Sequence, residues 1–261
     1  MKKNIRVNMY EYSFPLMGGK YDDDGDFEIL NIVGTAFHIG GNYFITAGHV
    51  VEQLKTYTAK AMLKVGELNG DGVPKGQEIV IFDKYEDKKE FEIIKEKDIG
   101  ILYLVVNPKN SLLWSLGNYF PPELFRVFGY PFSFDKNNNE ITIRSITGNI
   151  VSVRNFRTDT INSRVYELSA ICPKGISGAF LLEDSKLNII GLIIGNSSSE
   201  IEICYEEETS IENKNKTVFM KSEVIKYGIA ITNQEIYEIY SVLLENNILD
   251  HLKNQNLIQE T

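Results

Sequence analysis

Three separate stretches of the sequence carry a histidine, an aspartate and a serine, the side chains that serine acyl transfer requires. His49 lies in ITAGHVV, Asp98 begins DIGILYLVV, and Ser177 lies in GISG. A serine hydroxyl is a weak nucleophile at neutral pH unless a neighbouring base takes its proton, and imidazole has a suitable pKa for that task. A buried carboxylate holds the imidazole in the required tautomer. The sequence therefore predicts Ser177 as nucleophile, His49 as general base and Asp98 as the carboxylate that orients it.

Each stretch also has an ordinary structural explanation. A lone histidine in an apolar run is more often a packed core residue, and Asp98 alone reads as the entry to a strand, which would leave Asp83 and Asp87 as the next candidate carboxylates. A Gly-x-Ser-Gly tetrad arises by chance in roughly one chain in ten of this length. The combination favours chemistry, because Gly175 can turn its own N–H and that of Ser177 toward one point. We therefore expect these two N–H groups to form an oxyanion hole.

The elements that must position these residues are mostly β-strands. Short apolar runs such as VGTAFHI, EIVIF, LFRVFGYP and LNIIGLIIG recur along the chain, separated by turn signals. Two stretches predict helix: a short one from His49, and a longer one in TNQEIYEIYSVLLENNILDHL with Thr232 or Asn233 as its cap. Many strands without alternating helices favour a barrel or a sandwich. The stretch 107–122, with prolines at both ends, is the expected crossing between two β units.

These motifs resemble those of the trypsin-like (chymotrypsin-fold) serine peptidases, of the disulfide-poor bacterial kind. The blocks that carry the resemblance are GTAFHIGGNYFITAGHVV, DIGILYL and GISGAFLL, with weaker echoes in VFGYP, GLIIGN and GIAI. The resemblance spans roughly residues 30–245 and implies an all-β fold of two six-stranded antiparallel β-barrels with a C-terminal α-helix. The implied parts are a first barrel (1–112) with His49 and Asp98, a second barrel (113–232) with Ser177, and a helix and tail (233–261).

The resemblance also places a substrate pocket beside the nucleophile. Counting back from Ser177 puts Ile171 and Cys172 at the base of the pocket, and counting forward puts Gly195 and Asn196 along its wall. No acidic residue occupies the base, so a preference for Lys or Arg does not follow.

Two departures from the family pattern stand next to the nucleophile. Ala179 and Phe180 replace the usual Gly-Pro after Gly178. Ile176 stands where the digestive members carry an aspartate that pairs with a newly cut N-terminus. We therefore expect a chain that is competent without N-terminal trimming.

Composition narrows the classes of partner. The 261 residues are 43% hydrophobic and 24% charged, with a net charge of -9 and a pI near 5.0. This balance argues against nucleic acid and anionic membrane, since both are bound mainly through clustered Lys and Arg. The start of the chain has no apolar core of signal-peptide length, and Cys172 and Cys204 are compatible with free thiols, although one bridge stays open. We expect a cytoplasmic serine endopeptidase that acts on protein or peptide substrates without metal or organic cofactor, with room for a regulatory protein partner.

Two competing functions remain. Gly175-x-Ser177-x-Ala179 approximates the nucleophile elbow of a lipase-like α/β-hydrolase, with Asp250-His251 downstream, but such an elbow needs a helix after the serine. The other alternative is a catalytically silent trypsin-like fold used as a binding or scaffolding module.

Three further stretches are expected at the surface. YDDDGDFE (21–28) predicts an acidic hairpin tip rather than a calcium loop, because Gly25 precedes Asp26 and flanking helices are absent. The Asn-rich turn 135–139 and the stretch 197–210, which includes CYEEETS, are interpreted as loops that restrain activity until substrate or a partner orders them.

Overall fold

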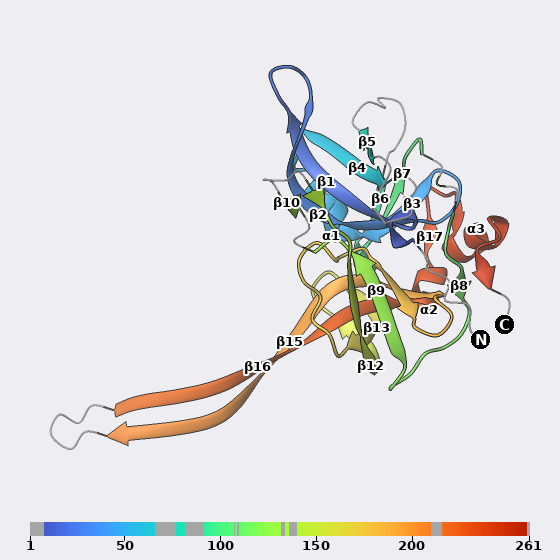
Figure 1. The fold of residues 1–261 in the computed structure, drawn as a ribbon. Helices are drawn as coiled ribbons and strands as arrows, with labels where there is room; N and C mark the ends of the chain where they lie inside the picture. Colours follow the sequence, from blue (N-terminus) through green and yellow to red (C-terminus); the bar gives the residue numbers. More distant parts are fainter. Residues whose placement is uncertain are drawn as a thin grey trace, which may run out of the picture.

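The structure is a computed structural model that describes residues 8–65, 77–81, 91–106, 108, 110–131, 134–135, 140–209 and 216–259. Two β units lie one above the other, and a long two-stranded ribbon extends away from the lower one (Figure 1).

The first unit is a seven-stranded antiparallel sheet in the order β5-β4-β1-β2-β3-β7-β6. Strands such as FITA and GILY are continuous runs of apolar or small, mostly buried residues, which suits strands packed on both faces. In chain order, its elements are η1 (Met9–Glu11), β1 (Ser13–Tyr21), β2 (Phe27–His38), β3 (Tyr43–Ala47), α1 (Gly48–Leu54), β4 (Ala59–Val65), β5 (Gln77–Ile81), β6 (Phe91–Ile94), η2 (Lys95–Lys97) and β7 (Ile99–Tyr103).

The second unit closes into a ring of strands, in the order β14-β9-β12-β13-β16-β15, because β15 pairs with β14 as well as with β16. This ring matches the predicted six-stranded barrel, whereas the first unit has seven strands within its described residues. The strands are β8 (Trp114–Ser115), β9 (Leu124–Gly129), β12 (Arg144–Arg157), β13 (Asn162–Leu168), β14 (Phe180–Glu183), β15 (Ile189–Thr209), β16 (Lys216–Thr232) and β19 (Ile258–Gln259). A separate small hairpin of β10 (Phe134–Asp135) and β11 (Glu140–Ile141) packs against the first unit through Ile141.

One hydrophobic core runs through both units. Phe37 of the first unit packs edge-to-face against Phe180 of the second, with ring centroids 5.4 Å apart, and lies 5.7 Å from the ring of Trp114. All three side chains are almost fully buried. Burying one such aromatic side chain contributes on the order of 2–3 kcal/mol. The shared core therefore fixes the two units against each other.

The C-terminal segment differs from the single longer helix that its periodicity predicts. It forms α2 (Asn233–Tyr237), a small hairpin of β17 (Tyr240–Ser241) and β18 (Asn246–Asn247), and α3 (Ile248–Asn254). The expected cap is correct, since the Thr232 hydroxyl oxygen accepts the Glu235 N–H at 3.3 Å.

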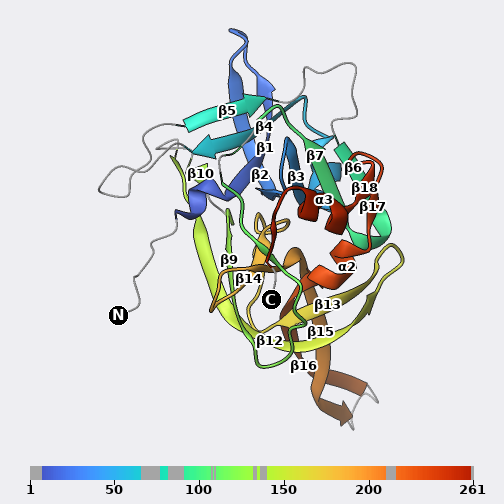
Figure 2. The same ribbon diagram turned by 90° about the vertical axis from the view of Figure 1, so that its right-hand side faces the viewer.

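A carboxylate from the first unit accounts for the break between α2 and α3. Glu92 on β6 accepts the N–H groups of Val242 and Leu243 at 3.0 Å and the hydroxyl of Ser241 at 2.6 Å. In a continuous helix, the N–H groups of Val242 and Leu243 would instead have donated to carbonyl oxygens of the same helix. Figure 2 shows β17 and β18 beside β6 of the first unit. A tertiary contact thus overrides the local helical pattern.

The stretch 197–210, expected to be a loop, is strand as far as the structure describes it. Beyond the ring, β15 and β16 continue as a paired ribbon from Ser197 opposite Tyr227 to Thr209 opposite Lys216. The ribbon is the arm that extends from the lower unit in Figure 1. Residues 136–139 of the other expected loop lie outside the described residues. The loop interpretation of 197–210 was therefore wrong, because the stretch after residue 215 supplies a pairing partner.

The acidic stretch 21–28 is a hairpin tip, as predicted. Asp22 closes the turn between β1 and β2: its carboxylate accepts the N–H groups of Asp24 and Asp26 at 3.1 and 2.8 Å.

None of the helices that the structure describes has the length and apolar character to cross a membrane.

Candidate functional site

The strand register of the first unit places His49 beside Asp98. β3 pairs antiparallel with β7, and Ala47 at the end of β3 lies opposite Ile99 at the start of β7. The residues just beyond this pair are Gly48, after β3, and Asp98, before β7. The Gly48 N–H donates to the Asp98 carbonyl at 2.8 Å. A Cβ on Gly48 would lie 3.0 Å from Asp98 Oδ1, so the glycine permits this close approach. α1 begins here and carries His49.

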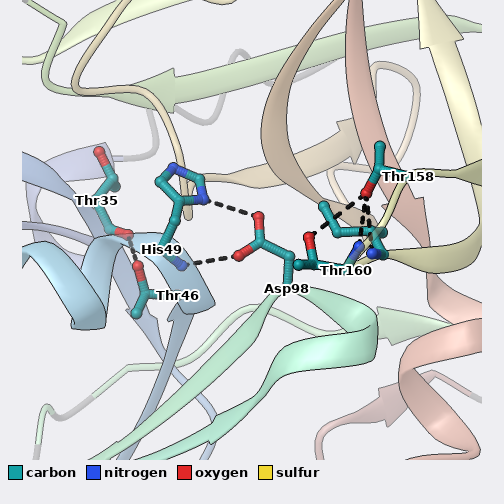
Figure 3. Close-up of polar contacts among 7 residues, drawn as sticks. Thr35, Thr46, His49, Asp98, Thr158 and Thr160 are labelled. Carbon is teal, nitrogen blue, oxygen red and sulfur yellow. Dashed lines mark hydrogen bonds and ion pairs between the residues drawn. The ribbon is translucent and has the colours of Figure 1, made fainter.

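Two hydrogen bonds hold the histidine against the carboxylate (Figure 3). His49 Nδ1 lies 2.8 Å from Asp98 Oδ2, and the His49 backbone N–H donates to Asp98 Oδ1 at 2.8 Å. A carboxylate at Nδ1 favours the tautomer with its proton there, which leaves Nε2 as an acceptor. The His49 side chain is 44% exposed and that of Asp98 only 11%. The carboxylate thus holds the Nδ1 edge of the ring, and the side chain stays partly exposed to solvent.

Asp98 occupies an uncommon backbone conformation. Its φ of 48° and ψ of 44° lie in the left-handed region, where aspartate is one of the few side chains found regularly. Its N–H donates to the Lys95 carbonyl at 3.1 Å, which closes the one-turn η2 helix. This turn aims the carboxylate at His49 instead of along β7.

The Ser177 loop requires glycine at two positions. Gly175 has a φ of 97° and Gly178 a φ of 85°. A Cβ at Gly175 would lie 2.6 Å from the Tyr130 carbonyl oxygen, and one at Gly178 would lie 2.1 Å from the Thr35 carbonyl oxygen. Both contacts are with backbone, so the loop cannot shift cheaply to admit a side chain.

Thr35 on β2 joins the serine loop to the first unit, and sequence reasoning did not single it out. The Thr35 N–H donates to the Ser177 carbonyl and its hydroxyl to the Gly175 carbonyl, both at 2.9 Å. The Thr35 carbonyl in turn accepts the Thr46 hydroxyl at 2.6 Å (Figure 3). The available signal was two threonines inside the otherwise apolar strands VGTAF and FITA, since a buried hydroxyl has to find a partner.

On the serine side of the candidate site, three hydrogen-bonding groups have no partner within the part of the chain that the structure describes. Among the described residues, neither the Gly175 N–H nor the Ser177 N–H donates to a backbone or side-chain acceptor. The half-buried Ser177 hydroxyl has no hydrogen bond to the His49 ring, although both residues are described. The site therefore combines a fixed imidazole, a free hydroxyl and two free N–H groups.

The predicted pocket residues fall into two groups. Cys172 and Asn196 touch: the Cys172 N–H donates to Asn196 Oδ1 and the Asn196 Nδ2 donates to the Cys172 carbonyl, both at 2.7 Å. The side chain of Ile171 is 56% exposed, and a Cβ at Gly195 would meet nothing within 4 Å. Cys172 is a free thiol, and burial raises its pKa to about 12.

The structure also bears on the remaining expectations from the sequence. The lipase-like alternative is wrong, because the strand β14, and not a helix, follows Ser177. His251, the histidine of that alternative, instead has its Nε2 2.9 Å from the Ile39 carbonyl. Ile176 is completely buried in the core of the second unit. Asp83 and Asp87 lie outside the described residues, and within the described part no three His, Cys, Asp or Glu side chains form a group that could hold a metal ion.

Comparison with known proteins identifies the fold. The active form of the Rv3671c protease from M. tuberculosis superposes with a TM-score of 0.53 at 13% identity, covering 97% of this chain and 84% of that chain. The MamO protease domain from Magnetospirillum magneticum gives 0.52 at 13% identity, covering 88% and 96%. The HtrA-type protease AlgW with a tripeptide gives 0.51 at 14% identity, covering 87% of this chain and 60% of that one.

No protein-family model matches this sequence, and the search of curated proteins gives no match either. At these identities the structural similarity concerns the fold. The chain has the two-barrel, all-β fold of the trypsin-like serine proteases, as its motifs predicted.

Proposed function

We propose that this chain is a serine endopeptidase that cleaves protein or peptide substrates through an acyl-enzyme. Ser177 is the nucleophile, His49 the general base and Asp98 the carboxylate that orients it. The observation that carries the proposal is the His49 ring held at Nδ1 by Asp98, 2.8 Å away, while the His49 side chain stays 44% exposed.

The chemistry follows from these positions. His49 Nε2 takes the proton of the Ser177 hydroxyl as Oγ attacks the substrate carbonyl carbon, and Asp98 stabilises the imidazolium that forms. The N–H groups of Gly175 and Ser177 donate to the oxygen that becomes negative. His49 then gives the proton to the departing amine, which leaves the acyl group on Ser177. A water molecule, deprotonated by His49, releases the acid and restores the serine.

We place the enzyme in the cytoplasm. A buried, unpaired thiol at Cys172 supports this, since free cysteines are typical of reducing compartments. The peptide-bound AlgW structure is consistent with a peptide substrate for a protein of this fold.

A second candidate is a silent binding module of the same fold. One observation favours it, which is the missing hydrogen bond between the Ser177 hydroxyl and the His49 ring. Catalytic hydrogen bonds are often long in the absence of substrate and tighten on binding, so the peptidase is the better-supported function.

A peptide-library digest tests the proposal. The purified chain is incubated with a mixed peptide pool, and new termini are identified by mass spectrometry. We expect cleavage by the native chain and by Ser145→Ala, an exposed serine on β12, and none by Ser177→Ala. Equal cleavage by Ser177→Ala would refute the mechanism, and no cleavage by a folded native chain would favour the binding module.

A further inference from the structure

A pocket of about 280 Å³ lies at the junction between the two units. Residues 8–10, at the start of the first unit, form one wall of this junction pocket. Phe128 on β9, Ile143 and the first residue of β12, Arg144, line the opposite wall. The volume is close to the lower end of the range for small-molecule sites, about 300–1,000 Å³. The pocket therefore has room for a small ligand.

Three hydrogen bonds hold the two walls of the junction pocket together. The Ser13 hydroxyl donates to the Phe128 carbonyl at 3.2 Å, and the Tyr130 hydroxyl donates to the Ser13 carbonyl at 2.7 Å. The Ile143 N–H donates to the Tyr10 hydroxyl oxygen at 3.5 Å. Tyr10 and Ile143 also pack against the buried cluster that contains Tyr130. The walls are thus fixed by contacts on both sides of the junction.

Arg144 brings an uncompensated positive charge to this pocket. Its side chain is exposed, and within the part of the chain that the structure describes its guanidinium makes no hydrogen bond and no ion pair. Arg154, on the same strand, is instead paired with Glu167 at 2.6 Å. A guanidinium presents its donors in a planar fork that matches the two oxygens of a carboxylate. The chemistry of Arg144 therefore favours a carboxylate as the partner.

The carboxylate on the opposite side, Glu11 of η1, is bound to other groups. One of its oxygens accepts the Asn8 side-chain amide at 3.0 Å, and the other accepts that of Asn110 at 2.7 Å. The Tyr10 hydroxyl accepts the bond from Ile143, and its own proton has no acceptor among the described residues. The junction pocket thus offers two kinds of donor and no competing anion from η1.

The rest of the lining is apolar, with Met9 on one wall and Phe128 and Ile143 on the other. We propose that the junction pocket binds a small organic acid, with its carboxylate on Arg144 and the Tyr10 hydroxyl and its apolar body against these three side chains. Two sources carry this chemistry, a free aryl or alkyl carboxylate and the C-terminal residue of a peptide.

Binding at this pocket has a consequence for stability that does not depend on the proposed peptidase function. The walls belong to different units, so the pocket exists only while the two units are docked. A ligand that binds the folded chain and not the unfolded chain raises the free energy of unfolding as its concentration rises. We therefore expect Tm to increase with the concentration of the acid.

Phenylacetate is the probe that tests the proposal. It is titrated into the isotope-labelled chain, and the backbone amide signals are followed by NMR. We expect the signals of Tyr10 and Arg144, on opposite walls, to shift together and to give one dissociation constant. The neutral phenylacetamide should bind roughly tenfold more weakly or worse, because hydrogen bonds to an ionised group are the stronger ones. N-acetylphenylalanine that binds more tightly than phenylacetate would assign the site to peptide ends, and the reverse order to free acids.

Arg144→Gln should weaken binding of phenylacetate roughly tenfold to a hundredfold and remove the rise in Tm. Tyr10→Phe keeps the ring and should weaken binding severalfold, which provides a second variant. Arg157→Gln is the matched control, because Arg157 is an exposed arginine at the other end of β12, and it should leave the dissociation constant unchanged. The proposal is overturned if the native chain shows no saturable shift at these residues, if phenylacetamide binds as well as phenylacetate, or if a folded Arg144→Gln chain keeps the native affinity.

Discussion

The two halves of the site are built differently. His49 and Asp98 lie on neighbouring strands of one unit and are joined by bonds of 2.8 Å from the ring and from the backbone. Among the described residues, the Ser177 side chain has no such partner; bonds within the second unit, such as that from the Gly178 N–H to the Ile193 carbonyl, hold its loop there, and Thr35 of the other unit binds the carbonyl oxygens of Gly175 and Ser177. The base is therefore preorganised locally, whereas the position of the nucleophile relative to the base depends on how the two units dock. Substitutions in the first half should affect chemistry alone, and those at the junction should affect both chemistry and stability.

The largest expected effect comes from Asp98→Asn. An asparagine has one acceptor oxygen, so it can keep the bond from the His49 N–H only by presenting its NH₂ group to Nδ1, which favours the wrong tautomer. We expect kcat to fall by roughly 10⁴-fold with little change in Tm. Steady-state kinetics and thermal unfolding measure the two quantities. A near-native kcat would make Asp98 a strand-entry residue and would direct attention to Asp83 and Asp87.

Thr35→Val tests the junction between the units. Valine keeps the shape but leaves the Gly175 carbonyl without its donor and the Tyr130 N–H without its acceptor at 3.3 Å. Leaving a buried group unpaired costs about 1–3 kcal/mol, so Tm should fall by roughly 3–10 °C, together with kcat/KM. Thr35→Ser keeps the hydroxyl and should keep most of both. Loss of activity without loss of stability would show that the junction acts only on the chemistry.

Lys97→Met tests a second link between the units, next to Asp98. The Lys97 ammonium donates to the Asn162 carbonyl on β13 of the second unit at 2.9 Å and pairs with the Glu235 carboxylate on α2 of the C-terminal segment. The two side chains are 26% and 20% exposed, so solvent screens the pair and its loss should cost no more than about 1 kcal/mol. We expect a small fall in Tm and a severalfold lower kcat, because η2 is less firmly held. Lys20→Met, in an exposed pair with Glu28, should change neither quantity.

The smallest expected effect concerns His38 and His251, two buried histidines that lie outside the candidate site. Burial lowers the pKa of His38 and His251 below the value of 6.5 that the ring has when exposed. Below pH 6.5 the unfolded chain therefore binds more protons than the folded chain. The contribution of the two neutral rings to the free energy of unfolding is complete above pH 6.5 and is lost as the pH falls toward their folded-state pKa values. Tm should drop between pH 7.5 and 5.5 in the native chain and drop less in a His38→Gln/His251→Gln variant. An equal drop in both chains would assign acid sensitivity to other groups.

Local patterns were enough to nominate the candidate site residues, whose catalytic roles stay predictions. His49 at the start of a short helix, Asp98 at the start of a strand and Ser177 between two glycines are each recognisable in a few consecutive residues. The fold class followed from many short strands and the order of the motifs. The acidic hairpin tip was equally local, because Asp22 bonds within its own turn.

The features that were missed depend on residues distant in the sequence. The C-terminal helix breaks because Glu92 bonds a turn about 150 residues later in the chain. Thr35 joins Gly175 across 140 positions, and the Asn196 amide closes on Cys172 only because β15 and the serine loop lie side by side. The stretch 197–210 was interpreted as a loop because its pairing partner, β16, begins only at Lys216 and is not recognisable from the stretch itself. Pairwise contacts of this kind have no signature in a single sequence.

Covalent labelling with an alkyl fluorophosphonate tests the central claim most directly, because the reagent needs the nucleophile, the base and the oxyanion donors but no substrate specificity. The native chain is treated, its intact mass is measured, and the modified residue is located by peptide mapping. We predict one adduct per chain, on Ser177, formed orders of magnitude more slowly in His49→Ala and at the native rate in Ser145→Ala. A folded native chain that takes no adduct, or takes it at another residue, would contradict the account.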